Sequence, residues 1–358
     1  MNLDRILIKM YANDMSNLLI SDPVSIHYLT GYHTHPGERL LLLNIASDGN
    51  HQLYVNQLFP LARVDAAIEI ITYKDGEPVI QWLSERLLPG KTGIDKFWPS
   101  HFLIELMQQH KDLTPVQGSF IIDDLRSIKS EAEQTLMKKA SQLNDEAMQQ
   151  LIDLVQYGLS EQAMVQQLAQ IYQSLGCDGF SFEPIIAYGK NAADPHHETN
   201  HDKPQRGEAV VLDIGTRYEG YCSDMTRTIF YGEPDEESLH IYQLVKAANE
   251  AAIAQVKPGV SFAEIDRAAR DIIEKAGYGQ YFTHRTGHFI GREVHEAGDV
   301  SAFNHELAQV GQIFSIEPGI YLPNKIGVRI EDLVLVTEDG CEVLNHVSKD
   351  PIIIPLSV

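Results

Sequence analysis

The sequence is poor in cysteine, and this bears on both its scaffold and its compartment. Its 358 residues include only three cysteines, Cys177, Cys222 and Cys341. The number is odd and no two of them form a Cys-x-x-Cys pair, which argues against a disulfide framework and fits a reducing compartment. We expect Cys222 to fill a small apolar site rather than to bind a metal.

Basic residues are scarce as well. The chain has 28 Lys and Arg against 50 Asp and Glu, so its formal net charge is −22. Such a charge argues against nucleic acid and anionic membranes as partners. No apolar run is long enough to span a bilayer, and the first residues lack the apolar core of a signal peptide. The expected location is therefore the cytoplasm.

The sequence does contain enough apolar material for two domains, because hydrophobic residues make up 44% of it. The first third alternates short apolar strands with helical patterns, which indicates an α/β domain with a mixed sheet. The pattern changes at Asp123, so the predicted domains are 1–122 and 123–358. The predicted strands of the first domain are 17–20, 39–45, 52–55, 68–72 and 91–95, and its predicted helices are 3–12, 56–66, 78–88 and 101–110.

The second domain contains an internal repeat. Ser160 and Ser261 each open a helical pattern that ends before a glycine, Gly176 or Gly277, and the two copies are offset by 101 residues at both ends. Serine suits the N-cap of a helix and glycine its C-terminal end. An acidic pair follows each copy. The repeat predicts two helix-plus-hairpin halves related by a pseudo-twofold, with a site at their junction.

Four acidic residues stand in two similar apolar settings. Asp213 lies in the segment VVLDIG and Asp224 in YCSDMT, with the turn signal Glu219-Gly220 between them. Glu317 and Glu331 flank a second turn in the same way. Each pair therefore predicts a β-hairpin whose strands bring two carboxylates close together.

A single acidic residue in a strand usually faces solvent or pairs with an arginine, and this interpretation stays open for each of the four residues alone. Two similar pairs among apolar neighbours, together with His288, instead favour a buried cluster of carboxylates. Four buried carboxylates repel one another and lose hydration, unless cations neutralise them. Two divalent metal ions meet that demand. Carboxylates and one imidazole suit manganese, our first expectation, or zinc, cobalt or iron.

Several segments of the sequence resemble one family of enzymes. They are LTGYHTHPGERLLLL (29–43), LDIGTRYEGYCSDMTRT (212–228), HRTGHFIGREVHE (284–296), FSIEPGIY (314–321) and GVRIEDLVLVTEDG (327–340). These segments resemble the pita-bread metallopeptidases and, within them, the bacterial prolidases, which are Xaa-Pro dipeptidases. The resemblance runs over nearly the whole chain. It implies an α/β N-terminal domain followed by an α+β pita-bread catalytic domain with an internal pseudo-twofold repeat.

The resemblance also implies roles for the five residues. Asp213 chelates one metal, His288 and Glu317 bind the other, and Asp224 and Glu331 bridge the two. A water between the metals loses a proton near neutral pH and, as hydroxide, attacks the carbonyl carbon of the Xaa-Pro bond. Glu317 is the expected proton shuttle.

Two further histidines match family positions. His196, in Asp-Pro-His-His, and His295, in Val-His-Glu, are expected to stabilise the tetrahedral intermediate as catalytic hydrogen-bond donors. The chain has 15 histidines, so any one of them alone is more often a surface or structural residue; the motif context singles out these two.

A dipeptidase must also recognise the substrate's C-terminal carboxylate, which suits arginine. Arg292 is the first candidate. Arg329 is expected to face the metals, where it either binds substrate or buffers the acidic cluster. In relatives the loop that corresponds to 32–39 reaches the partner subunit's active site. His35 and Arg39 are therefore expected to shape substrate choice within a homodimer.

Two positions depart from the family pattern. Phe289 stands where glycine usually follows the ligand histidine, and Ala297-Gly298 replaces the usual pair after Glu296. Both are expected to change the pocket wall and hence the size of the substrate. Two alternatives stay open: an Xaa-Pro aminopeptidase that acts on longer peptides, which usually has a longer chain, and a peptidase-dead binding module, which usually lacks a ligand.

Overall fold

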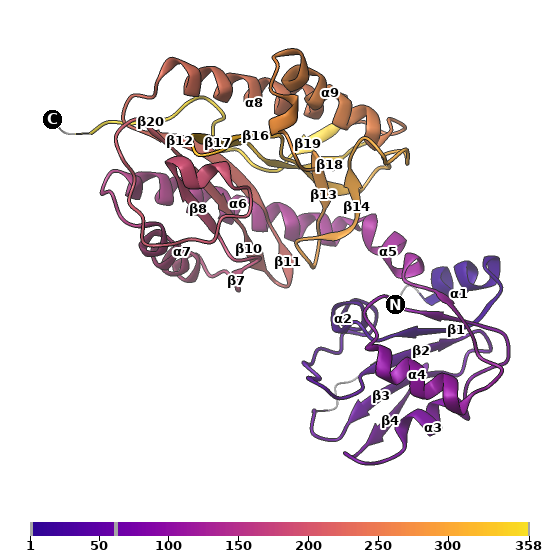
Figure 1. Cartoon of the computed structure of the whole chain (residues 1–358). Helices are drawn as coiled ribbons and strands as arrows, with labels where there is room; N and C mark the ends of the chain where they lie inside the picture. The colour runs from indigo at the N-terminus through magenta and orange to yellow at the C-terminus, as the bar shows by residue number, and fades with distance from the viewer. Residues whose placement is uncertain (1–2, 61–63, 357–358) are drawn as a thin grey trace. The chain divides into compact units, whose positions relative to one another are not determined.

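The computed structural model describes residues 3–60 and 64–356. The chain forms two compact units, Met1–Leu125 and Arg126–Val358 (Figure 1). The division falls inside helix α5 (Phe120–Ser127), which the sequence pattern did not predict. No helix in the two described ranges is both long and apolar enough to cross a membrane.

A six-stranded mixed sheet, in the order β4-β3-β2-β1-β5-β6, forms the centre of the N-terminal unit. Leu18 and Leu19 are neighbours on β1 and point to opposite faces. Leu18 packs with α1, α2 and α5, whereas Leu19 packs with α3 and α4. The predicted α/β class and mixed sheet are confirmed. The elements are α1 (Leu3–Ala12), β1 (Met15–Ile20), α2 (Pro23–Thr30), β2 (Leu42–Ala46), β3 (His51–Asn56), β4 (Ile68–Tyr73), α3 (Val79–Ser84), β5 (Lys91–Ile94), α4 (Ser100–Gln109) and β6 (Thr114–Gln117).

The predicted helix 56–66 is wrong for the residues that the structure describes. Residue 56 belongs to β3, residues 57–60 and 64–66 form turns and irregular backbone, and 61–63 lie outside the described residues. Asn56 ends β3 and its side-chain oxygen accepts the Leu58 N–H at 3.0 Å, while its amide donates to Asp75 at 2.8 Å. This local bonding by an asparagine side chain competes with helix formation.

The C-terminal unit consists of two similar halves, as the repeat predicted. Helices α7 and α9 are each 14 residues long, and Ser160 and Ser261 cap them. Gly176 and Gly277 follow them with φ of +75° and +87°, the left-handed conformation that ends many helices. The first half contains α6 (Glu131–Val155), α7 (Glu161–Ser174), β7 (Gly179–Phe180), β8 (Ile185–Tyr188), η1 (Gly189–Ala193), β9 (Glu208–Ile214), β10 (Thr216–Tyr218), β11 (Tyr221–Cys222) and β12 (Met225–Tyr231). The second half contains α8 (Glu236–Gln255), α9 (Phe262–Lys275), η2 (Gly279–Tyr281), β13 (Gly287–Phe289), β14 (Glu296–Val300), β15 (Ile313–Ile316), β16 (Gly319–Leu322), β17 (Ile326–Arg329), β18 (Asp332–Val336) and β19 (Cys341–Val343), and β20 (Ile353–Ile354) returns to pair with β12.

The strands of this unit lie between two helix pairs (Figure 1). Helices α6 and α7 pack on β8, β9 and β12, and α8 and α9 pack on the strands of the second half. The long helix of each half also supports a strand end. The buried amide of Asn144 on α6 donates to the Ile214 carbonyl at 2.9 Å, and that of Asn249 on α8 donates to the Ile316 carbonyl at 2.9 Å. Both carbonyls belong to residues adjacent to a predicted metal ligand.

Candidate active site

The four acidic residues lie at or beside points where strands are interrupted. Asp213 pairs with Thr226 in the β9–β12 ladder, and Asp224 occupies the gap between β11 and β12, so the two carboxylates are diagonal neighbours. Glu317 follows β15, and Glu331 precedes β18 on the opposite strand. The predicted hairpins are confirmed. At these strand ends Asn144 and Asn249 donate to the Ile214 and Ile316 carbonyls, and so help to satisfy buried backbone groups.

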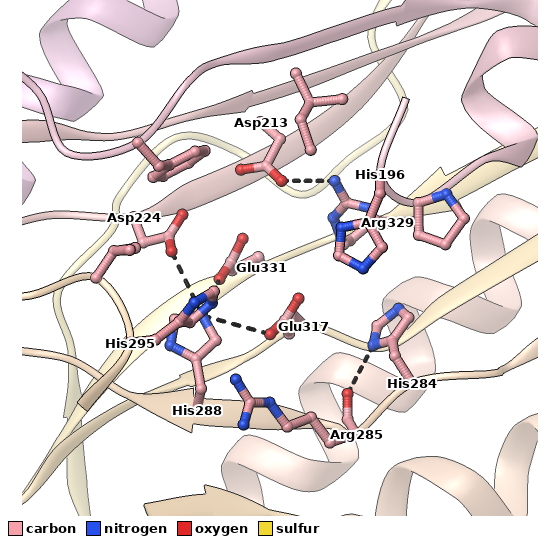
Figure 2. Close-up of a pocket in the computed structure, with 14 residues that line it drawn as sticks. His196, Asp213, Asp224, His284, Arg285, His288, His295, Glu317, Arg329 and Glu331 are labelled. Carbon is pink, nitrogen blue, oxygen red and sulfur yellow. Dashed lines mark hydrogen bonds and ion pairs between the residues drawn. The ribbon is translucent and has the colours of Figure 1, made fainter. Parts of the chain in front are cut away.

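These hairpins converge with His288 of β13 on one buried point (Figure 2). His288 Nε2 lies 3.5 Å from an oxygen of Asp224, 3.5 Å from one of Glu317 and 4.0 Å from one of Glu331. One ligand atom from each of Asp224, His288 and Glu331 lies within 4.8 Å of the others. The nearby Asp213 carboxylate accepts from Arg329 at 2.5 Å. Five residues from distant parts of the chain thus line a single site.

The donor set fits divalent cations. Within the described ranges, Asp213 Oδ1, Asp224 Oδ1 and Glu331 Oε1 are buried and have no hydrogen-bond partner. A buried carboxylate oxygen without a donor is costly, and a cation removes that cost. Oxygen donors with a single imidazole are the set expected for manganese, iron, cobalt or zinc.

The electrostatics of the carboxylates lead to the same conclusion. Burial and the neighbouring carboxylates raise the pKa of Asp224 and Glu331 well above the usual range, and burial raises that of Glu317 to about 7. Burial also lowers the pKa of His288, which favours the neutral ring that binds metals. Bound cations would lower these carboxylate pKa values again, so the cluster has the electrostatic character of a cation site.

Polar contacts fix the two hairpins relative to each other. Thr226 donates its hydroxyl to Glu331 at 2.7 Å, and the Glu331 N–H donates to the Thr226 carbonyl at 3.1 Å. The buried Arg227 guanidinium donates to the Glu331 carbonyl at 2.6 Å and to Asp332 at 2.6 Å. One arginine thus holds the second hairpin against the first beside a ligand.

A cavity of about 500 Å³ opens onto this site, a size suited to a small ligand. Its wall includes all five predicted metal ligands and both predicted catalytic histidines. The lining residues are Phe182, Ile185, Pro195, His196, Asp213, Asp224, His284, Arg285, His288, Val294, His295, Glu317, Arg329 and Glu331.

His295 lies beside the ligand histidine, with its ring 4.2 Å from that of His288 in an edge-on arrangement. Burial and then the neighbouring His288 lower the pKa of His295 to about 4, so its ring is neutral at neutral pH. The next residue, Glu296, is held by two cations of the same unit. Arg126 donates to it at 2.7 Å and Lys129 at 3.1 Å, and these contacts fix the loop that carries His295.

The sequence interpretation gave no role to two cavity-lining residues and to one tyrosine that contacts this wall. Arg285 and His284 line the cavity (Figure 2). Tyr321 lies behind them, and its hydroxyl contacts His284 Nε2 at 2.8 Å and accepts from Arg329 at 2.9 Å. Burial lowers the pKa of His284 to about 4. The segment HRTGH contained the signal for Arg285 and His284, because both directly precede the ligand strand.

Arg292 lies away from the position that its expected role requires, whereas Arg329 faces the site as expected. Arg292 is not among the cavity-lining residues, and its guanidinium lies 4.8 Å from the centre of the Tyr221 ring. Arg329 does line the cavity, but its guanidinium donates to Thr226, Tyr321 and Asp213. These contacts favour the alternative that Arg329 buffers the acidic cluster.

The expected effect of Phe289 on the pocket wall is wrong. Because side chains alternate along a strand, Phe289 points away from the cavity when His288 points into it. Phe289 is buried against Phe262 and Phe314, with ring centres 5.2 and 5.6 Å away. A Cβ on Gly298 would lie 2.6 Å from the Phe289 ring, so the two departures from the family pattern fit each other.

The predicted loop residues belong to the N-terminal unit. Arg39 makes two hydrogen bonds to Asp75, both of 2.9 Å, and an ion pair with Glu38. The His35 ring is exposed and lies 5.0 Å from the His33 ring. The ion pair with Asp75 thus ties the end of the 32–39 loop to its own unit.

Comparisons with known proteins agree with this geometry. Residues 135–338 match metallopeptidase family M24, and residues 2–128 match the creatinase/prolidase N-terminal domain. An uncharacterized peptidase of Staphylococcus aureus is 37% identical over 337 residues, which are 92% of this chain and 94% of that protein.

Two crystal structures are similar over almost their whole length. A dipeptidase from Pyrococcus horikoshii has 35% identity and a TM-score of 0.93, covering 99% of this chain and 100% of its own. A prolidase from Thermococcus sibiricus has 32% identity and a TM-score of 0.91, covering 99% and 98%. The chain therefore belongs to metallopeptidase family M24, with a creatinase/prolidase N-terminal domain before a pita-bread catalytic unit.

Proposed function

We propose that this peptidase hydrolyses Xaa-Pro dipeptides with two divalent metal ions. The observation that carries the proposal is the convergence of four carboxylates and His288 on one buried wall of a small cavity. The similarity to structures described as a dipeptidase and a prolidase supports it. Asp213 would hold one ion, His288 and Glu317 the other, and Asp224 and Glu331 both. When bound, the ions, with manganese expected, supply an activated water and polarise the scissile carbonyl.

The chain's own groups complete the chemistry. Glu317, within 3.5 Å of His288, takes the proton that the attacking water loses and returns it to the leaving proline nitrogen. His196 and His295 line the cavity, where they can donate hydrogen bonds to the carbonyl oxygen as negative charge develops on it. His295 serves as a neutral donor, because its pKa is about 4.

Arg285 replaces Arg292 as our candidate for the substrate carboxylate. It lines the cavity, is half-buried, and its guanidinium has no hydrogen bond or ion pair with the described residues. Arg329, the other arginine there, is already bonded to three protein groups. A guanidinium without a partner in a cavity can bind a carboxylate through two parallel hydrogen bonds.

We further propose a homodimer in which the 32–39 loop of one subunit completes the cavity of the other. Arg39, fixed by Asp75, would hold the loop, and the exposed His35 would contact the Xaa side chain. Sedimentation should show a dimer, and His35→Ala should change the preference among Xaa residues. A monomer with full activity would contradict this arrangement.

The experiment compares Ala-Pro, Ala-prolinamide and Ala-Pro-Ala as substrates of the manganese-loaded and the chelator-treated protein. We expect rapid cleavage of Ala-Pro only with metal, and slow cleavage of the other two. Arg285→Ala should raise KM for Ala-Pro about 10- to 100-fold, the scale of a lost charged hydrogen bond, and should leave Ala-prolinamide unchanged. Arg292→Ala is the matched control.

The alternatives have distinct outcomes. Efficient cleavage of Ala-Pro-Ala would make the protein an Xaa-Pro aminopeptidase with the same metal chemistry. Failure to cleave any peptide with any of the four metals would leave a binding module. Glu-Pro serves as a further substrate. If Arg285→Ala slows the cleavage of Glu-Pro but not of Ala-Pro, Arg285 binds an acidic Xaa side chain rather than the C-terminal carboxylate.

A further inference from the structure

We propose that Glu161 is a positioning residue for His196. His196 is carried by a loop, residues 189–202, that contains η1 and otherwise no helix or strand. The side chain of Glu161, the first residue of α7, lies at the centre of this loop and is fully buried. The proposal rests on the proposed function only in that His196 acts in turnover.

Four hydrogen bonds from the loop and its preceding strand converge on this carboxylate. Oε1 accepts from the Tyr188 N–H at 3.0 Å and the Asn191 side-chain amide at 2.9 Å. Oε2 contacts His197 Nε2 at 2.7 Å and accepts from the Asn200 N–H at 2.9 Å. The four partners lie on both sides of His196 in the sequence. One side chain therefore closes the loop that places the histidine at the cavity.

The backbone of α7 adds to this closure. The Glu161 N–H donates to the Asp202 carbonyl at 3.0 Å, and the Gln162 N–H donates to the Asn200 carbonyl at 2.9 Å. Near the start of the loop, Ala192 packs so closely on β17 that a Cβ on Gly327 would lie 1.6 Å from the Ala192 oxygen. Both ends of the loop are thus fixed to rigid elements, and Glu161 connects them.

Among the residues that the structure describes, His196 has no comparable anchor of its own. Its side chain is exposed at the cavity, and its N–H donates to the exposed Asp194 at 3.0 Å. The neighbouring His197 instead contacts Glu161 with a largely buried ring. The position of His196 therefore depends on the bonds that its neighbours make to Glu161.

Glu161→Gln tests this dependence without changing the size of the side chain. Four donors need a carboxylate, because a glutamine presents one oxygen and turns its NH2 toward the remaining donors. The control is Glu131→Gln. Glu131 is also the first residue of a serine-capped helix, α6, but its side chain is exposed, so this variant reports the loss of helix-end charge alone.

We expect Glu161→Gln to lower kcat about 10-fold or more, as expected for a displaced catalytic group, with metal content retained. Hydrogen–deuterium exchange should rise in residues 185–202. In a His196→Ala background the same change should lower kcat less than about 2-fold, since its effect passes through that histidine. His197→Ala, which removes one of the four bonds, should show a smaller effect with the same dependence, and it serves if Glu161→Gln does not fold. Glu131→Gln should change neither kcat nor the hydrogen–deuterium exchange of residues 185–202.

Wild-type kcat in Glu161→Gln, or an equal loss in the His196→Ala background, would overturn the proposal. The double-mutant comparison can use any peptide that the enzyme cleaves, so a different substrate class does not affect it. If the wild-type protein cleaves no peptide, the proposed function fails, and increased exchange in 185–202 still shows whether Glu161 holds the loop.

Discussion

The two halves of the catalytic unit share a framework but use one equivalent position differently. At the start of α7 stands Glu161, whose buried carboxylate holds the loop that carries His196. We call His196 and His295, which line the cavity, the rim histidines. The equivalent residue at the start of α9 is Phe262. Its ring packs against Phe289 and Phe314, 5.2 and 5.3 Å away, directly behind the strand that carries His288.

The difference shows how equivalent positions in a repeated backbone can support different elements of the site. Each half retains a capped helix, a hairpin with two carboxylates and a buried asparagine, Asn144 or Asn249, at a strand end. One side chain in the first helical turn then decides which element is supported. A carboxylate organises a polar loop through directional bonds, whereas an aromatic ring supports a ligand strand through packing.

The largest expected effect tests whether the halves are equivalent at the metals. Asp224→Asn in the first half and Glu331→Gln in the second should both remove bound metal and lower turnover more than about 100-fold, because each is assigned to both ions. Elemental analysis of the purified variants gives the metal content. Full metal content in either variant would show that its half does not supply a bridging ligand.

The rim histidines provide the next comparison. His196→Ala in the first half and His295→Ala in the second should retain metal and fold but lower kcat about 100-fold, the scale of a lost oxyanion donor. Steady-state kinetics and elemental analysis on the same preparations separate the two effects. If one variant keeps wild-type turnover, that half supplies only metal ligands.

Metal removal should reveal the repulsion between the two hairpins. The pKa of Glu317 is raised from 4.5 to about 7, and those of Asp224 and Glu331 are raised too. Below about pH 6.5 the lowered pKa values of His284, His288 and His295 act in the opposite direction. Above that pH the metal-free folded state binds more protons than the unfolded state, and its free energy of unfolding should fall as pH rises. The melting temperature of chelated protein should drop between about pH 6.5 and pH 8, and the increase caused by manganese should grow. A melting temperature that rises in chelated protein would contradict the prediction.

The smallest effect concerns the aromatic side of the second half. Gly298 has φ of +113° and a Cβ there would meet the Phe289 ring at 2.6 Å. Gly298→Ala should therefore cost about 2 kcal/mol or more in denaturant unfolding. The control is Gly259→Ala, which has φ of +83° but nothing within 4 Å, so only the backbone cost remains. Equal losses in the two variants would mean that the Phe289 contact contributes nothing.

Sequence patterns predicted this framework because they report local periodicity and turn chemistry. The repeated serine caps and terminal glycines located α7 and α9, and the turns between acidic residues located both hairpins. The same reasoning placed Asp213 near Asp224 and Glu317 near Glu331, since hairpin geometry depends only on residues close in the sequence. The repeat then predicted that the two pairs meet at the junction of the halves.

The cavity wall and the residues that support it depend on contacts between distant parts of the chain, which sequence periodicity does not reveal. Arg285 and Arg292 lie on either side of His288, and only the folded structure shows which guanidinium lines the cavity. Phe289 could have been placed, because its neighbour His288 takes the cavity face of the strand. In the sequence Glu161 looks like an ordinary acidic residue of a first helical turn. Its four partners come from β8 and from the loop that follows it.

The ion pairs around Glu296 bear on how this protein can be divided. The match to the catalytic family begins at residue 135, yet Arg126 and Lys129, which compensate the buried Glu296, precede that point. A fragment cut at the family boundary would leave a carboxylate uncompensated beside His295, a change that typically costs several kcal/mol. The compact catalytic unit therefore begins inside α5, and residues 126–134, which precede the family match, belong to it.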